Sequence, residues 1–194
     1  GTLGLAESHY RGALSKDPEL QVARLNLARL LKNRNHLSES ESLLSKLIEQ
    51  ESESFFEARL LLSSIWVEQG QLAAAIGVLK ATSDRFPGEP YLNLQLGKLM
   101  AMAGSLEEAH RYLVEATQGL EKNRRSDISL VEIQGEANYI LAYLSQQVGS
   151  WNLVEYYLSE TFKVQPEHIE ARMLSAAYEI GTGNDIAGRD QLKW

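Results

Sequence analysis

Apolar residues in this chain recur every three or four positions, in short runs separated by glycine, asparagine and proline. This spacing places them on one face of an amphipathic α-helix. In residues 56–89, one run ends at Gly70, and a second begins at Leu72 and ends before Pro87-Gly88. Proline cannot extend a helix, and glycine permits a positive φ. The pattern therefore predicts two helices joined by a tight turn.

The same design recurs at a regular interval. Four turn glycines, Gly70, Gly104, Gly149 and Gly183, are separated by 34, 45 and 34 residues. Such an interval is typical of helical repeat arrays, in which each repeat buries its apolar face only against its neighbours. We predict an all-α fold, a right-handed α-α superhelix of about five helix-turn-helix repeats and about eleven helices. Within one domain of residues 1–194, the expected boundaries are a partial repeat at 1–20, full repeats at 21–55, 56–89, 90–134 and 135–168, and a partial repeat at 169–194.

Local signals mark further turns and helix starts. The stretch Asn33–Asn35 replaces the turn glycine of its repeat, and asparagine tolerates the left-handed conformation better than most residues. Two serines are followed three residues later by glutamate, Ser38 by Glu41 and Ser105 by Glu108. These pairs predict capping boxes at the starts of two second helices.

The repeat at 90–134 exceeds the period by eleven residues. The extra length falls at 120–134, where a polar and basic stretch leads to Ser126-Asp127, a good helix start. The apolar positions that follow are compatible with one long helix over 127–148. We interpret the insertion as a longer loop followed by extra turns of helix. Simple length variation in a repeat array and a dedicated contact both remain open.

Small and large residues follow a fixed order within the repeats, because small residues let adjacent helices approach and large ones fill the remaining space. In this order the chain resembles the tetratricopeptide-repeat family over essentially its whole length. The match is weaker where Ser40, Val154 and Gly188 replace the usual alanine. The residues that carry the resemblance are Leu96, Gly97, Gly104, Ala109, Leu113 and Ala116; Ala6, Tyr10, Ala13 and Pro18; and Trp66, Gly70, Ala75 and Pro87.

Composition narrows the classes of partner. The formal net charge is −7, which disfavours nucleic acid because phosphate binding needs a basic face. No apolar run reaches the ~20 residues needed to cross a bilayer, so we expect no direct membrane insertion. Cysteine is absent, which excludes disulfides and thiolate chemistry. We expect a soluble protein, cytoplasmic or periplasmic, and interpret the partial repeats at both ends as signs of a piece of a longer chain.

No group of residues predicts catalysis, a cofactor or a metal. The histidines, His9, His36, His110 and His168, lie in different repeats without partners at metal-binding spacing. We interpret them as ordinary surface or packing residues. The stretch 181–183 lacks the lysine and hydroxyl residue of a phosphate loop and fits a turn between helices. We therefore predict that the protein is not an enzyme.

The resemblance also implies a binding surface. In the family, the first helix of each repeat lines the concave side of the superhelix, where a clamp of Lys, Arg and Asn can hold a C-terminal carboxylate. Here the clamp positions hold leucine or tyrosine, so the clamp is not present as such. The expected groove has an apolar and aromatic floor with few charges, which suits a protein segment. The predicted partner-binding residues are Leu25, Arg29, Leu60, Ser64, Leu94, Lys98, Tyr139 and Tyr143.

These observations favour a protein–protein interaction scaffold or adaptor that binds a protein or peptide segment in a concave groove. One alternative is a non-catalytic regulatory or assembly arm of a larger enzyme, or of secretion or polysaccharide-export machinery. Another is a self-association module that forms a homo-oligomer through an exposed repeat end or the region of Trp194. The sequence leaves the three open.

Overall fold

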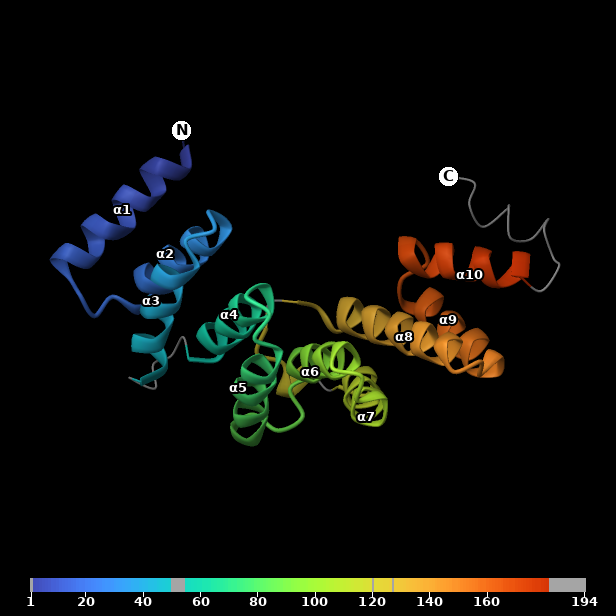
Figure 1. Ribbon diagram of the computed structural model, residues 1–194. Helices are drawn as coiled ribbons and strands as arrows, with labels where there is room; N and C mark the ends of the chain where they lie inside the picture. The colour runs from blue at the N-terminus through green and yellow to red at the C-terminus, as the bar shows by residue number, and fades with distance from the viewer. Residues whose placement is uncertain (1, 50–54, 120, 127, 182–194) are drawn as a thin grey trace. The chain divides into compact units, whose positions relative to one another are not determined.

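The computed structural model describes residues 2–49, 55–119, 121–126 and 128–181. These ranges contain ten α-helices, one short 3-10 helix and no β-strand (Figure 1), which confirms the all-α prediction. The expected turn at Gly183 and the helix after it lie outside the described residues. The elements are α1 (Thr2–Lys16), α2 (Gln21–Asn33), α3 (Leu37–Glu49), α4 (Phe55–Glu68), α5 (Leu72–Arg85), α6 (Pro90–Met102), α7 (Leu106–Thr117), η1 (Glu121–Asn123), α8 (Leu130–Gln147), α9 (Trp151–Val164) and α10 (Ile169–Gly181).

The helices form two compact units, an N-terminal unit of residues 1–85 and a C-terminal unit of residues 86–194. In the N-terminal unit, α2 packs on α3 and α4 packs on α5, and α3 also contacts α4. Its core includes the fully buried Leu44 and Ile65. In the C-terminal unit, α6 packs on α7, α7 on α8 and α8 on α9, around core residues such as Leu141. Within each unit, successive helices bury one another's apolar faces, as a repeat array requires.

The turns between paired helices adopt the predicted left-handed backbone. This conformation is open to glycine without steric cost and is tolerated by asparagine, which explains the residue types at these points. The described turn residues and their φ angles are Asn35 (61°), Gly70 (74°), Gly104 (77°) and Gly149 (71°). After Gly104, the amide of Ser105 donates to the carbonyl of Met100 at 2.9 Å, which satisfies a group that the end of α6 would otherwise leave open.

Close approach of α6 and α7 depends on a glycine within the first helix. A Cβ added at Gly97 would lie 2.6 Å from Cγ of Leu113 and 3.3 Å from the backbone oxygen of Ala109. Leu113 and Ala109 are themselves fully buried. The small residue therefore makes the space that a large one fills, which is the packing expected from the order of residues in the sequence.

Both predicted capping boxes are wrong. Helix α3 begins at Leu37, so Ser38 lies inside the helix, and Glu41 instead accepts a hydrogen bond of 3.0 Å from the indole Nε1 of Trp66. Ser105 does precede α7, but its side chain makes no cap hydrogen bond. Backbone hydrogen bonds of the tight turn around Gly104 fix the start of α7.

The predicted start of the long helix at Ser126-Asp127 is also wrong. Helix α8 begins at Leu130 because a capping box forms just before it. Oγ of Ser129 accepts from the amide of Glu132 at 3.2 Å, and Oε2 of Glu132 accepts from the amide of Ser129 at 2.9 Å. The hydroxyl of Ser129 also donates to Oε2 of Glu132 at 2.8 Å. This bond, together with the one from the amide of Ser129, holds the pKa of Glu132 below its ordinary value. The insertion is thus a loop that contains η1, followed by a helix longer than its counterparts.

Two glycine substitutions test this packing. Both Gly97 and Gly77 lie inside helices, where alanine is intrinsically preferred by roughly 1 kcal/mol. A Cβ at Gly77 in α5 would meet nothing within 4 Å, unlike one at Gly97. We expect Gly77→Ala to stabilise the chain by about 0.5–1 kcal/mol and Gly97→Ala to destabilise it by about 1–2 kcal/mol. Chemical denaturation measures both, and equal stabilisation would contradict close packing of α6 on α7.

Candidate functional site

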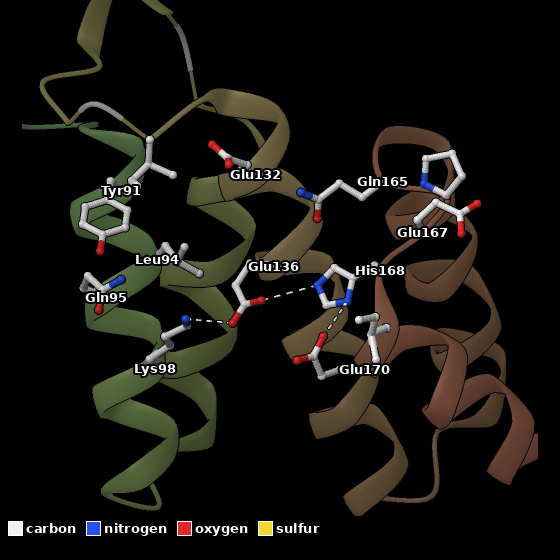
Figure 2. A pocket seen from close by; sticks show the side chains of 13 residues that line it. Tyr91, Leu94, Gln95, Lys98, Glu132, Glu136, Gln165, Glu167, His168 and Glu170 are labelled. Carbon is white, nitrogen blue, oxygen red and sulfur yellow. Dashed lines mark ion pairs between the residues drawn. The ribbon is translucent and has the colours of Figure 1, made fainter. Parts of the chain in front are cut away.

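The C-terminal unit contains a groove with a volume of about 610 Å3, which we call the α6–α10 groove. Figure 2 shows α6 on one side, the loop before α10 on the other, and side chains of α8 between them. Helix α6 contributes Tyr91, Leu94, Gln95 and Lys98, which share one helical face. The groove is therefore built on the first helices of two repeats and on the start of a third.

A chain of polar contacts crosses the groove (Figure 2). Nζ of Lys98 on α6 lies 2.8 Å from Oε1 of Glu136 on α8. The other oxygen of Glu136 lies 3.4 Å from Nε2 of His168, and Nδ1 of His168 lies 3.3 Å from Oε2 of Glu170. Glu136 is the centre of this series of contacts, because one of its carboxylate oxygens faces Lys98 and the other faces His168.

His168 is the most enclosed polar group of the groove, with a side chain that is 6% exposed. Its ring packs on that of Tyr139, with 5.1 Å between centroids. Its Nδ1 also accepts a hydrogen bond of 3.4 Å from the amide of Ala171, so a neutral His168 caps α10. A doubly protonated ring would instead donate to both Glu136 and Glu170. The two arrangements exclude each other because one nitrogen cannot accept and donate at once.

Two tyrosines border the groove and remain neutral. Burial raises the pKa of Tyr91, and the negative charge of Glu89 raises it further. Burial also raises the pKa of Tyr139, with additional contributions from the carboxylates of Glu170 and Glu136 and from Tyr143. Both phenols are therefore hydrogen-bond donors at neutral pH.

The insertion forms part of the groove wall, and the buried carboxylate of Glu89 holds it in place. Glu89 is 1% exposed. Its Oε2 accepts from the amide of Leu92 at 2.5 Å and caps α6, and its Oε1 accepts from the amide of Arg125 at 3.0 Å. The guanidinium of Arg125 in turn stacks on Phe86, 4.5 Å from the ring centroid. These contacts tie the inserted loop to the start of α6, and the loop brings Ile128 to the edge of the groove.

Four of the residues predicted to bind a partner lie in the C-terminal unit. Leu94 and Lys98 line the groove, although Leu94 is only 3% exposed and belongs to the core. Tyr139 flanks the groove through its contact with His168. Tyr143 lies one turn further along α8 and is 45% exposed.

The other four predicted residues lie on α2 and α4 of the N-terminal unit and are not part of this groove. Leu25 is 7% exposed and packs in the core of that unit. Arg29 is exposed, whereas Leu60 and Ser64 are partly buried. The hydroxyl of Ser64 donates to the carbonyl of Leu61 at 2.7 Å, within its own helix.

Sequence analysis did not connect His168, Glu170 or Ile128 with the groove. These residues lie in a loop, in the first turn of α10 and in the insertion, so projecting the inner faces of first helices does not bring them together. The available signal was the acidic and histidine-containing stretch directly after Pro166, at a repeat boundary.

The described residues contain neither a candidate metal site nor a candidate membrane-spanning helix. In residues 2–49, 55–119, 121–126 and 128–181, no group of three or more His, Asp or Glu side chains has the arrangement needed to hold a metal ion. No helix of the same ranges has the length and apolar character needed to span a bilayer.

Comparison with known proteins supports the resemblance to a family. Residues 1–65 match the family model described as tetratricopeptide repeat. The crystal structure of MamA resembles this chain with a TM-score of 0.68 and 16% identity, over 90% of this chain and 89% of MamA. YrrB, described as a TPR protein with an unusual peptide-binding site, gives a TM-score of 0.64 and 16% identity, over 94% of this chain and 88% of YrrB. The resemblance to the tetratricopeptide-repeat family is confirmed.

A more specific likeness covers part of the chain. Cellulose synthase operon protein C of Komagataeibacter sucrofermentans is 27% identical over 109 residues, which is 56% of this chain. That stretch is 8% of the relative's length, so this chain corresponds to a small part of a much longer protein. The likeness leaves the partner of this chain to be inferred from its groove.

The role of Glu89 in this tetratricopeptide-repeat fold can be tested by removing its carboxylate. Glu89→Ala leaves the amides of Leu92 and Arg125 without their acceptor, and we expect a loss of about 2–4 kcal/mol in the free energy of unfolding. Ser105→Ala is the matched control, because Ser105 stands at the same position before α7 without a cap hydrogen bond from its side chain. It should change stability by less than about 0.5 kcal/mol. Similar denaturation midpoints for the two variants would contradict the anchoring role.

Proposed function

We propose that this chain is a protein–protein interaction module and that the α6–α10 groove holds a segment of a partner protein. The observation that carries the proposal is the combination of an apolar floor with polar groups on the same concave surface. Tyr91 and Leu94 form apolar parts of the lining, and Ile128 and Ile169 are 38% and 52% exposed at the groove. A partner side chain that covers these residues gains hydrophobic burial, and nearby polar groups orient it.

The shape of the groove favours an extended or helical segment over a small molecule. It is open to solvent and is formed by helices that run past one another, so a chain can enter and leave along it. Tyr139 and Tyr143 continue the same side of α8 beyond the groove. Tyrosine is favoured at protein interfaces because it buries a large rigid area and keeps a hydrogen-bonding hydroxyl.

A catalytic role is disfavoured by the chemistry of the lining. Among the described residues, no serine, threonine or cysteine lines the groove, so the aliphatic hydroxyl or thiol of a common nucleophile is not found there. Its one histidine is occupied with packing on Tyr139 and capping α10. We therefore propose a binding surface that carries out no reaction and needs no cofactor.

The four candidate residues of the N-terminal unit remain a proposal of their own. Arg29 and Ser64 carry polar groups on α2 and α4, and Leu60 is partly exposed between them in sequence. In our proposal these first helices contact a further part of the same partner. Substitution there tests whether binding extends beyond the α6–α10 groove.

A second candidate function is an assembly arm of polysaccharide-producing machinery. It is favoured by the 27% identity to cellulose synthase operon protein C over more than half of this chain. The two candidates are compatible, because an arm of this kind would act by binding another component. Co-purification of this protein with polysaccharide synthase subunits tests the second candidate. Light scattering over a dilution series tests the alternative of a homo-oligomer.

Substitutions in and beside the groove should weaken binding selectively. Peptides selected from a displayed random library on the 194-residue chain serve as probes, with affinity measured by fluorescence anisotropy. We expect Tyr139→Ala and Tyr143→Ala each to weaken binding by about 1–3 kcal/mol, because each removes an aromatic anchor. Thermal melts identify any variant that has lost its fold.

Glu107→Ala and Arg111→Ala on α7 are the controls, since both side chains are exposed and lie outside the groove. They should leave affinity unchanged within about twofold, the range expected of contacts that carry no binding energy. Loss of binding in the α7 variants with no effect of the tyrosine substitutions would contradict the proposal.

A further inference from the structure

The charges of the α6–α10 groove specify the kind of segment that fits it. We propose that the occupant is a basic protein segment, which places an arginine or lysine against the carboxylates of Glu136 and Glu170 and apolar neighbours against Ile128 and Ile169. This inference rests on the proposed function and adds the chemistry of the partner to it.

Acidic side chains outnumber basic ones in the lining. Glu132, Glu136, Glu167 and Glu170 contribute four carboxylates, and among the described residues Lys98 is the only Lys or Arg that lines the groove. Arg172, which does not line the groove, forms an ion pair of 2.7 Å with Glu167 and so neutralises one of the four carboxylates. The remaining excess of negative charge attracts a cation and repels an acidic segment.

A cationic side chain of the protein already occupies this surface. The ammonium of Lys98 reaches across from α6 to Glu136 on α8 at 2.8 Å, and both side chains are about one-third exposed. The contact shows that a carboxylate of the groove accepts an ammonium at ion-pair distance. Because partly exposed pairs of this kind are weak, a partner's cation can replace Lys98 at small cost.

Glu170 offers an accessible carboxylate. Its side chain is 62% exposed, and its contact with His168 is an ion pair only when the histidine is protonated. With the neutral histidine, Nδ1 bonds to the amide of Ala171, and the carboxylate of Glu170 is turned toward the groove without a cationic partner in the lining. A guanidinium has several donors in one plane and can bind two carboxylate oxygens at once, so arginine should be preferred to lysine.

The surroundings of the carboxylates complete the match. Exposed Ile128 stands on the insertion side and exposed Ile169 on the α10 side. A segment in which a basic residue is flanked by apolar residues therefore satisfies both kinds of surface.

The experiment is the selection of displayed random peptides on the 194-residue chain, read out as the composition of the peptides retained. We expect arginine and lysine next to apolar residues to be enriched and aspartate and glutamate to be depleted. The Arg→Gln version of an enriched arginine peptide should bind the protein about tenfold more weakly than the arginine peptide does. The affinity of the arginine peptide should fall as salt is added.

The doubly substituted E136Q/E170Q chain tests whether the carboxylates of Glu136 and Glu170 bind the basic residue of the peptide. It should bind the arginine peptide about tenfold more weakly than the natural chain. E107Q/E115Q on α7 removes the same amount of charge from an exposed surface outside the groove and should bind as the natural chain does. Equal binding by the two double variants would overturn the proposal.

The outcomes separate this inference from the proposed function. Retained peptides without basic residues, or with acidic ones, whose binding still depends on Tyr139 and Tyr143, would overturn the basic occupant and leave the interaction groove intact. Failure to retain any peptide class, or binding that no groove substitution affects, would contradict the interaction groove itself and the basic occupant with it.

Discussion

Close contact between paired helices is the constraint on which the rest of this structure depends. A single amphipathic helix cannot keep its apolar stripe from water, and each helix here is covered only by its neighbours within a compact unit. The approach of α6 to α7 requires a residue without a side chain at Gly97, facing a large one at Leu113. This contact sets the position of α6, and α6 in turn presents Tyr91 and Lys98 on its other side.

Features governed by local backbone conformation could be predicted from the sequence. A turn that needs positive φ admits few residue types, so the glycines at 70, 104 and 149 and Asn35 marked the turns correctly. Helix starts were harder, because several serines compete for each cap. Ser129 prevails over Ser126 because Glu132 returns its hydrogen bond, whereas the side chain of Ser105 makes no cap hydrogen bond and backbone bonds define its turn.

The groove was only partly predictable for a different physical reason. Lys98 and Tyr139 stand on the faces of first helices, so helical periodicity was enough to select them. His168 and Ile128 reach the same surface from a loop and from an insertion. Contacts between residues far apart in the sequence fix these segments: the amide of Arg125 bonds to Glu89, and His168 meets Glu136 and Tyr139 of α8. Periodicity carries no information about such contacts. The sequence pattern therefore did not predict the acidic character of the surface, which arises because Glu136 and Glu170 both face His168.

The position of Glu89 also bears on how this chain can be divided. The repeat period assigns Glu89 to the end of one repeat, yet its carboxylate caps the first helix of the next and holds the loop at Arg125. The sequence repeat and the structural module are therefore offset from each other by a few residues. A fragment cut at Pro90 would contain a whole repeat by sequence and still lack the group that organises it, whereas a fragment that starts at Phe86 carries its own anchor.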